Sequence, residues 1–329
     1  MRLMLLNLTR RGLGLAGLAI ACMVALPAAD AQDYPSRPIT LIVPFPPGGG
    51  SDLASRLIAN EMSKGLGQRI VIENKAGAGG NIGFNAGAKA APDGYTITTI
   101  TQNITVNPHL LKEMPFDPLK DLLPIGVMVQ VYSMLVATPS LPVSNVAELI
   151  AYGKARPGTL TGGHGGVGGQ AHLSMLLLAN AAGFKAEWIP YKGEAPVLLD
   201  LIGGRTSMTV QSLGGLGQHV QTGRLKALAV TSPTRMPQYP NVPAIAETLP
   251  GFEVAGWYGL AAPAGTPAAV VKRLSEQLRV VLDNPEVRKS LTEMGFVIKP
   301  HSPAEFGSLI NSDYRRIQKL VADAGIKPE

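Results

Sequence analysis

Hydrophobic and polar positions alternate with two different periods from residue 37 onward. Short β-type runs separate longer helical patterns, which is typical of sheets covered by helices. The first three strands are predicted at 39–43, 69–73 and 95–100. Residues 52–66 place Leu53, Leu57, Ile58 and Met62 on one helical face, and an alanine-rich helix is predicted at 81–91. The pattern therefore predicts an α/β fold.

The same alternation continues through the second half of the chain. Strands are predicted at 133–137, near 187–190 and at 225–230, and helices at 146–154, at 171–182 and before Gly203-Gly204. A glycine-rich turn is predicted at 162–169.

The tail is predicted to be helical, with well-marked helix starts. Thr266-Pro267 and Asn284-Pro285 each resemble a cap followed by a first-turn proline, and residues 302–305 form a capping box. The last helix should run to about Ala324 and pack through one apolar stripe: Phe306, Leu309, Ile310, Ile317, Leu320 and Val321.

The first 31 residues have the pattern of an export signal. Basic side chains precede an apolar run at 13–26, and Ala29-Asp30-Ala31 offers a cleavage site. The run is shorter than the roughly 20 residues of a membrane-spanning helix. We therefore predict a signal peptide at 1–31, cleaved after Ala31, and a periplasmic location. Arg10-Arg11 leaves both the twin-arginine and the general export route open.

Composition and charge exclude several classes of function. Without Arg2, Arg10, Arg11 and Asp30 the formal net charge falls from +6 to +4, and the basic residues are scattered, so no nucleic-acid partner is expected. Cys22, the only cysteine, lies in the predicted leader, where lipidation is an alternative to cleavage. The chain lacks H-E-x-x-H and G-x-S-x-G motifs, and its five histidines show no metal spacing. We expect no enzyme activity, metal or cofactor.

The first glycine-rich loop follows a predicted strand and precedes a predicted helix. Backbone N–H groups at such a helix start can hold an anion at the carboxyl end of the strand. Alternatively, the glycines only make a tight turn and Asp52 only caps the helix. The loop has no lysine and is no P-loop. The residues expected to contact a ligand here are Phe45, Pro46, Pro47, Gly48, Gly49, Ser51 and Asp52.

Two further loops have similar features. Gly79 and Asn81 precede the second helix, where a plain helix-entry turn is the alternative. The third loop contributes Gly165, Gly166, Val167, Gly168 and Gly169, with His172 at the start of the next helix. Its G-x-G-x-x-G match suggests a dinucleotide site, but no acidic ribose partner follows on the next strand. Two anion-binding helix starts explain these loops better.

The loops resemble those of the tripartite tricarboxylate transporter solute-binding proteins, the Bug or TctC family. The matching motifs, in chain order, are Pro44-Phe45-Pro46-Pro47-Gly48-Gly49 with Asp52, Glu73-Asn74 with Gly77-Ala78-Gly79-Gly80-Asn81-Ile82-Gly83, Pro92-Asp93-Gly94-Tyr95-Thr96, Pro190-Tyr191-Lys192-Gly193, and Ala261-Ala262-Pro263-Ala264-Gly265-Thr266-Pro267. The resemblance covers nearly the whole chain after the leader.

The resemblance implies a two-lobed periplasmic-binding-protein clamshell, each lobe a mainly parallel sheet flanked by helices. Lobe 1 is expected to comprise 32–130 plus 255–329, and lobe 2 to comprise 131–254. A small organic anion, such as a di- or tricarboxylate or an aromatic acid, is expected between the lobes. Thr101 and Gln102 would add to the first lobe's contacts, and Trp257 and Tyr258 would lie near the hinge. The implied partners are integral-membrane permease subunits, with the receptor a monomer.

One segment departs from the family pattern. Two acidic positions after the Gly-Gly turn are replaced within 206–211, and Gln211 stands at the second of them. If that acid normally meets an amine, Gln211 should bind ligand but disfavour amino acids. Two rival functions stay open at this point: a ligand-sensing subunit of a signalling system and an exported enzyme on a doubly wound fold.

Overall fold

The computed structural model describes residues 34–165, 169–191 and 194–323. Backbone contacts divide the chain into Met1–Ser36 and Arg37–Glu329, and all named strands and helices belong to the second unit. Several predictions fall outside the described residues: the leader at 1–31, the ligand contacts Gly166, Val167 and Gly168, the motif residues Lys192 and Gly193, and the helix end near Ala324.

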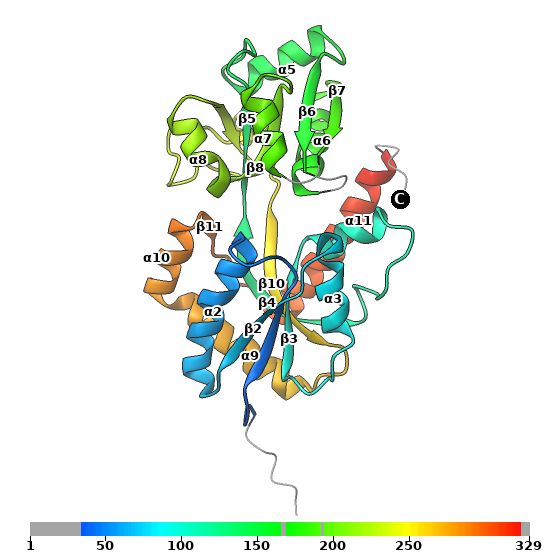
Figure 1. The fold of residues 1–329 in the computed structure, drawn as a ribbon, viewed down its shortest axis with the longest axis vertical. Helices are drawn as coiled ribbons and strands as arrows, with labels where there is room; N and C mark the ends of the chain where they lie inside the picture. The colour runs from blue at the N-terminus through cyan, green and yellow to red at the C-terminus, as the bar shows by residue number, and fades with distance from the viewer. Residues whose placement is uncertain (1–33, 166–168, 192–193, 324–329) are drawn as a thin grey trace, which may run out of the picture. The chain divides into compact units, whose positions relative to one another are not determined.

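A six-stranded sheet is built from both ends of this unit (Figure 1). Its strands are β1 (Ile39–Val43), β2 (Ile70–Asn74), β3 (Thr96–Thr101), β4 (Leu122–Val131), β10 (Gly256–Pro263) and β11 (Phe296–Val297), in the order β11-β4-β10-β3-β1-β2. Strand β1 is parallel to β2 and β3, whereas β10 is antiparallel to β3 and β4, and β11 is antiparallel to β4.

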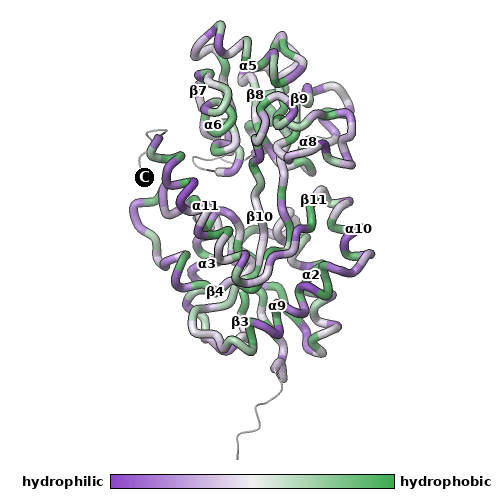
Figure 2. Tube along the Cα trace, turned by 180° about the vertical axis from the view of Figure 1, so that it is seen from behind, coloured by the Kyte–Doolittle hydropathy of each residue, from purple (hydrophilic) through white to green (hydrophobic). Residues whose placement is uncertain are grey.

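Helices cover both faces of this sheet. On one face α2 (Gly50–Leu66) packs beside α9 (Ala268–Asp283), followed by α10 (Pro285–Glu293), and the other face carries α3 (Asn81–Ala88) and α11 (Pro303–Asp323) (Figure 1). The short elements between β3 and β4 are α4 (Asn103–Val106) and the 3-10 helix Asn107–His109. Hydrophilic and hydrophobic positions alternate along α2, α9 and α11 (Figure 2), as expected for helices that bury one face.

The helix starts test the predicted caps. Asn284 accepts hydrogen bonds from the backbone N–H groups of Glu286 and Val287, and Ser302 and Glu305 form the reciprocal capping box, so both predictions are confirmed. The Thr266-Pro267 prediction is wrong by one residue, because α9 begins at Ala268 and Pro267 itself is the cap position.

The predicted faces are mostly correct. In α11, Phe306, Ile310, Ile317, Leu320 and Val321 are buried as predicted. In α2, Ile58 and Met62 are fully buried, but Leu53 is 44% exposed. The reason is angular: five residues separate Leu53 from Ile58, which at 100° per residue puts them on nearly opposite sides of the helix.

A five-stranded sheet is formed by the middle of the chain. Its strands are β5 (Ser133–Ala137), β6 (Leu160–His164), β7 (Ala186–Pro190), β8 (Met208–Ser212) and β9 (Lys226–Val230), in the order β7-β6-β8-β5-β9. Strand β6 is parallel to β7 and β8, and β5 is antiparallel to β8 and β9. The helices around it are α5 (Val146–Ala155), α6 (Gln170–Ala182), α7 (Glu194–Ile202) and α8 (Leu213–Gln221).

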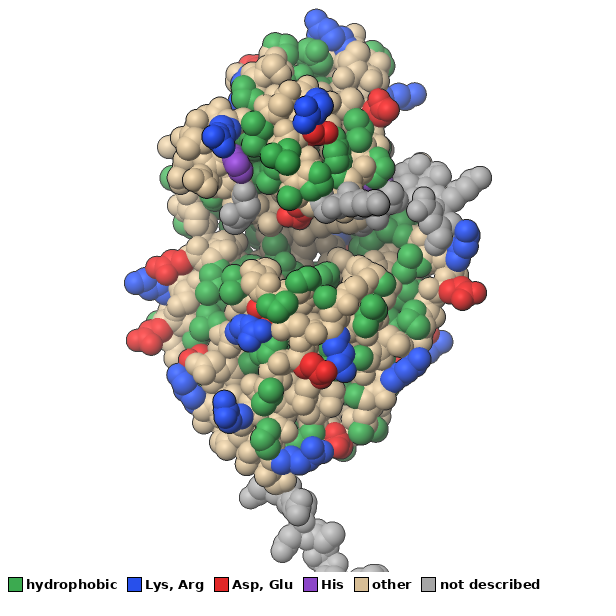
Figure 3. All heavy atoms as spheres, viewed as in Figure 1, with side chains coloured by type: hydrophobic (Ala, Val, Ile, Leu, Met, Phe, Trp, Pro, Cys, Tyr) green, Lys and Arg blue, Asp and Glu red, His purple; other side chains and the backbone are tan. Residues whose placement is uncertain are grey.

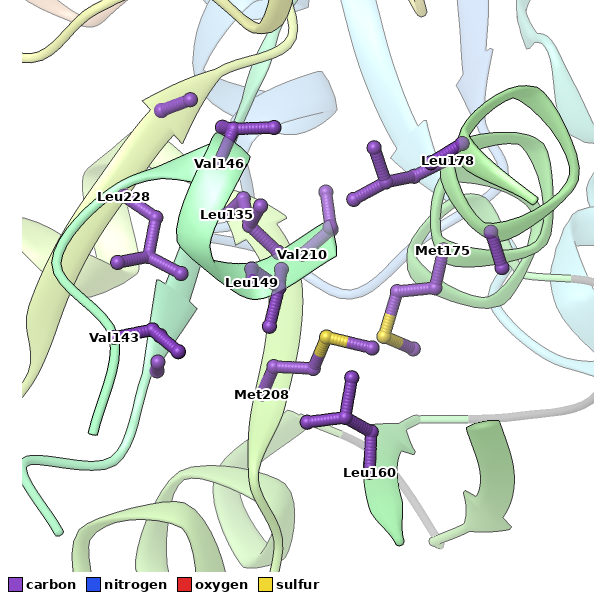
Figure 4. Close-up of a cluster of buried hydrophobic side chains, with 14 of the residues drawn as sticks. Leu135, Val143, Val146, Leu149, Leu160, Met175, Leu178, Met208, Val210 and Leu228 are labelled. Carbon is purple, nitrogen blue, oxygen red and sulfur yellow. The ribbon is translucent and has the colours of Figure 1, made fainter. Parts of the chain in front are cut away.

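Alternate residues of β5 supply the cores on its two faces. Leu135 belongs to a cluster with α5 and α6, in which Leu160, Met175, Leu178, Met208 and Val210 converge (Figure 4). Met134 and Val136 pack instead with Leu201 of α7 and Leu213 of α8. This period of two is the signature of a strand between two helical layers.

The α/β class with two sheets flanked by helices is confirmed, and both sheets are mixed. The parallel pairs of β1 with β2 and β3 join predicted strands, whereas those of β6 with β7 and β8 involve two strands, β6 and β8, that were not predicted. The antiparallel pairs are β3–β10, β4–β10, β4–β11, β5–β8 and β5–β9. Residues 162–164 belong to β6 and not to a turn. Gly162 is needed there because a Cβ atom would lie 2.6 Å from the Trp188 ring. Within the described residues, no helix is both long and apolar enough to cross a membrane.

Candidate functional site

A cavity of ≈ 600 Å³ lies at the carboxyl ends of β1 and β3 and at the first turns of α2 and α6. Ten residues predicted as ligand contacts line it: Phe45, Pro46, Pro47, Gly49, Ser51, Gly79, Thr101, Gln102, Gly165 and Gly169. Nine others line it without having been predicted as contacts: Gly50, Asn103, Asn107, Gln170, Ala171, Glu194, Gly256, Trp257 and Tyr258. Gly48, Asp52, Asn81, His172 and Gln211 do not belong to the lining.

Two helix N-termini at this cavity lack side-chain caps. The cap residue of α2, Gly49, and that of α6, Gly169, are both extended, with ψ of 164° and 163°, and neither helix start receives a side-chain hydrogen bond. The first N–H groups of a helix have no partner within the helix. Gly50 and Ser51 of α2 and Gln170 and Ala171 of α6 therefore present unused donors, and the positive ends of two helix dipoles, to one cavity.

Asp52 stabilises the start of α2 through three hydrogen bonds that its carboxylate accepts. Its side chain is 1% exposed and accepts hydrogen bonds from Gly48 N (2.9 Å), Arg56 Nε (2.8 Å) and Asn74 Nδ2 (2.9 Å). Burial alone would raise the pKa of Asp52, but the hydrogen bonds from Arg56, Gly48 and Asn74 outweigh burial and lower it. Asp52 thus holds the loop through Gly48, which at φ +84° adopts a conformation that favours glycine.

A small amide network supports the second loop. Asn81 is 4% exposed, and its Oδ1 accepts a hydrogen bond from Asn107 Nδ2 at 2.9 Å. Asn103 Nδ2 donates to the Gly79 carbonyl at 3.1 Å. Asn81 consequently lies behind the lining and orients Asn107, which does line the cavity.

Two lining residues, Trp257 and Gln102, are held by a buried acid of α11, Asp313. Trp257 Nε1 donates to Asp313 Oδ2 at 2.8 Å, and Gln102 Nε2 lies 3.4 Å from the same oxygen. Trp257 also meets Phe306 edge-on, with ring centroids 5.0 Å apart. Asp313 therefore holds two side chains that line the cavity, although Asp313 itself is not part of the lining.

His172 is buried beside the cavity and not within its lining. Its ring stacks on His164 with centroids 4.1 Å apart and an interplanar angle of 14°. Burial, and to a lesser extent the neighbouring His164, lowers the pKa of His172 to about 4. The pair thus joins the last residue of β6 to the first turn of α6.

Gln211 lies on β8 and is 3% exposed, away from the cavity lining. Among the described residues, its Nε2 has no hydrogen-bond partner.

The lining holds one charged side chain among the described residues, and that charge is negative. Glu194 begins α7 and is exposed to solvent, and partial desolvation by the cavity wall raises its pKa. The hollow on the face shown in Figure 3 is bordered mainly by hydrophobic and uncharged side chains. In the described part of the chain, no group of three or more His, Cys, Asp and Glu side chains is arranged to hold a metal ion.

The nine lining residues that the sequence did not predict were missed for different reasons. Gly50, Gln170 and Ala171 are direct neighbours of predicted contacts, and extending each predicted helix start by one or two residues would have found them. Glu194 follows the end of β7 at the start of a helix, a position that parallel strands place at the same edge as the other loops. Gly256 and Asn107 carry no such signal.

Comparison with known families gives one match over most of the chain. The model of the tripartite tricarboxylate transporter family receptor matches residues 54–326. A protein from the tcbD-tcbE intergenic region of Pseudomonas sp. strain P51 is 37% identical over 322 residues, covering 97% of this chain and 96% of that protein. BugT of Bordetella pertussis is 34% identical over 325 residues, covering 98% and 99%.

Solved structures with similar folds include proteins with bound acids. An R. palustris protein with adipate has 37% identity and a TM-score of 0.79, covering 90% of this chain and 100% of its own. MatC from Rhodopseudomonas palustris with bound malate has 31% identity and a TM-score of 0.73, covering 88% and 100%. The periplasmic binding protein BugD has 33% identity and a TM-score of 0.75, covering 90% and 100%.

Proposed function

The chain belongs to the tripartite tricarboxylate transporter receptor family, and we propose that its ≈ 600 Å³ cavity captures a small organic carboxylate. Family members are periplasmic solute-binding receptors and not enzymes. The bound acid is delivered, chemically unchanged, to integral-membrane permease subunits. Relatives with adipate and with malate support this class of ligand.

The observation that carries the proposal is the pair of uncapped helix starts at one cavity. Four N–H donors, two from each of α2 and α6, supply about 1.5–3 kcal/mol per hydrogen bond to a charged acceptor. Lost translational and rotational freedom costs at least roughly 4 kcal/mol. The remainder reaches about 8 kcal/mol at the upper end, which corresponds to micromolar affinity without a cationic side chain.

The proposed contacts are the lining residues that the sequence predicted, together with their neighbours at the helix starts. Gly50, Ser51, Gln170 and Ala171 bind carboxylate oxygens through backbone N–H groups. Asp52, Asn81 and His172 act from behind the lining by positioning the loops.

A thermal-shift screen tests the proposal. The protein is unfolded and refolded to strip carried-over ligand, then heated with mono-, di- and tricarboxylates, aromatic acids, amino acids and NAD. A ligand at 100 times its dissociation constant adds about 2.7 kcal/mol of stability, a shift of a few degrees. The neutral diamide of the best acid is the matched control and should give no shift. Stabilisation by NAD alone would point to a dinucleotide enzyme instead.

The absence of catalysis is tested with the same ligand. After prolonged incubation with a stoichiometric amount of protein, the acid should be recovered unchanged by mass spectrometry. Conversion that depends on intact protein would refute the receptor-only proposal.

Export is proposed through residues 1–31, with cleavage after Ala31 and a mature chain that begins at Gln32. Intact-protein mass spectrometry of the mature protein, taken from both the periplasmic and the membrane fraction, tests this. The mass of an acylated chain that begins at Cys22 would indicate lipidation, and a mass that includes Met1 would indicate that the segment is not removed.

The lobe boundaries remain our proposal: 32–130 plus 255–329 for lobe 1 and 131–254 for lobe 2. Strands β4 and β10 belong to the six-stranded sheet and β5 to the five-stranded sheet, so the proposed crossings lie at 131–133 and just before 256. We propose a monomer that closes on its ligand. The radius of gyration in solution should then shrink at saturation, and an unchanged scattering profile would contradict closure.

A further inference from the structure

Glu194 is an unusual residue to find in a cavity that binds anions. It is the one charged side chain among the described lining residues, and the structure gives it no hydrogen bond or ion pair within the described part of the chain. Its position in the first turn of α7 favours the ionised carboxylate, because a helix N-terminus stabilises negative charge.

The Glu194 carboxylate is open to solvent in the empty cavity, and no protein group within the described part of the chain pairs with it. Partial desolvation by the cavity wall raises the pKa of Glu194. Tyr258, which lines the same cavity, has a pKa raised to about 12, mainly by burial and further by the charge of Glu194. The charge of Glu194 therefore acts on another group that lines the cavity, and a second carboxylate beside Glu194 would be repelled.

A hydrogen-bond donor on the ligand would give the Glu194 carboxylate a partner and would avoid the repulsion of a second carboxylate. Glu194 lines the same cavity as the starts of α2 and α6, so the rest of an acid whose carboxylate binds at those helix starts can approach Glu194. An apolar group would leave the Glu194 carboxylate without a partner in a less hydrated site, and a carboxylate would add repulsion. A hydroxyl or ammonium group would pair with it.

We propose that Glu194 is a specificity-determining residue that selects acids bearing a hydroxyl or ammonium donor and disfavours the donor-free acids of the same length. This inference rests on the proposed carboxylate-binding function. It also revises the sequence-based expectation for Gln211: that side chain lies outside the cavity lining, so the acid that can meet a ligand amine is Glu194.

The test compares matched acids by titration calorimetry on the full mature protein. The probes are succinate, its 2-hydroxy derivative malate and its 2-amino derivative aspartate, and the corresponding set built on adipate. Each is titrated into the wild type, into Glu194→Gln and into the control Glu187→Gln. Glu187 is an exposed acid on β7 of the same sheet, outside the lining, so its variant removes the same charge without altering the cavity.

The wild type and Glu187→Gln should bind at least one donor-bearing acid about tenfold or more tightly than its donor-free parent. Glu194→Gln should lose most of that ratio and should bind the donor-free acid more tightly than the wild type does. A preference for the hydroxy acid alone or for the amino acid alone identifies which donor Glu194 receives.

Two other outcomes separate the failures. Equal affinity of the wild type for all the acids would overturn the role of Glu194 while the carboxylate-binding function stands. A wild-type preference that is unchanged in Glu194→Gln would do the same. Absence of binding for every acid in all three proteins would overturn the proposed function itself.

Discussion

Replacement of Asp52 by alanine should destabilise the protein and distort the start of α2. The carboxylate accepts three hydrogen bonds, from Gly48, Arg56 and Asn74. Hydrogen bonds to a buried charged group contribute about 1.5–3 kcal/mol each. The side chain of Arg56 is 48% exposed, so its share is reduced by solvent to at most about 1 kcal/mol. Water can partly replace the other two bonds, and the expected loss is about 2–4 kcal/mol.

The assay is urea unfolding of the unliganded protein, paired with a binding titration of the best acid. Because Asp52 holds Gly48, which directly precedes the cap residue Gly49, binding should weaken about tenfold, the equivalent of one lost hydrogen bond. The matched control is Asp283→Ala. Asp283 pairs with Arg279 at the same spacing on α9, but at 3.8 Å with both side chains exposed, so its loss should cost less than about 0.5 kcal/mol.

Equal stabilities of the two alanine variants would refute the structural role of Asp52. A pH series adds a second check. The folded state lowers the pKa of Asp52, so its contribution is present above the unfolded value of about 3.9 and is lost as pH falls through the lower folded value. The wild type should therefore lose its advantage over Asp52→Ala only below about pH 4.

Three further predictions concern the supports of the cavity. His172 has a folded pKa of about 4 against about 6.5 unfolded, so wild-type stability should fall by about 3 kcal/mol as pH drops through that window; urea midpoints that change in parallel in His172→Gln would contradict this. Gly83→Ala should lower the free energy of unfolding by about 1–3 kcal/mol, because the new Cβ would lie 2.7 Å from Pro44 Cα and 2.8 Å from the Lys75 carbonyl. In the same urea assay the control Gly307→Ala, whose new Cβ has its nearest neighbour at 3.8 Å, should be neutral or stabilising. Asp313→Ala should lower the free energy of unfolding by about 2–4 kcal/mol and weaken acid binding, because the buried Trp257 N–H loses its acceptor. The amide oxygen of Asp313→Asn should recover part of both losses. Equal unfolding midpoints for both variants and the wild type would exclude a supporting role of Asp313.

Local signals predicted much of the fold. Strand β1 matches its prediction, and β2, β3 and α2 differ from theirs by one or two residues at their ends. These elements have strong periodicity and glycine or proline boundaries. Strands β4, β6, β8, β10 and β11 were not predicted, although β4 and β10 are interior strands of the six-stranded sheet. Strand β10 contains Gly256, Gly259 and small alanines and is weak by propensity. Strand β4 has β-branched residues at alternate positions, but Pro124 and Gly126 interrupt its first half.

Pairing and close packing explain these two strands. Gly259 lies where a Cβ atom would meet Phe306 at 2.4 Å, and Gly126 lies where one would meet Leu278 at 2.9 Å. The glycines allow α11 and α9 to approach the sheet, a requirement that only the folded structure reveals.

The glycine-rich loops predicted where the cavity lies, because loops at the carboxyl ends of parallel strands gather at one edge of a sheet. They did not predict which side chains point into it. Asp52, Asn81 and His172 are polar residues in the right segments, yet each is buried behind the lining and bonded to the protein. Glu194 is separated in sequence from the first loop by more than a hundred residues, and its proximity depends on the arrangement of α7.

The most direct test of the central claim is a crystal structure of the protein with the acid that gives the largest thermal shift. Our account predicts carboxylate oxygens at about 2.7–3.2 Å from backbone nitrogens in the first turns of α2 and α6, among Gly50, Ser51, Gln170 and Ala171. An acid bound elsewhere, or one bound in this cavity with its carboxylate turned away from both helix starts, would contradict it.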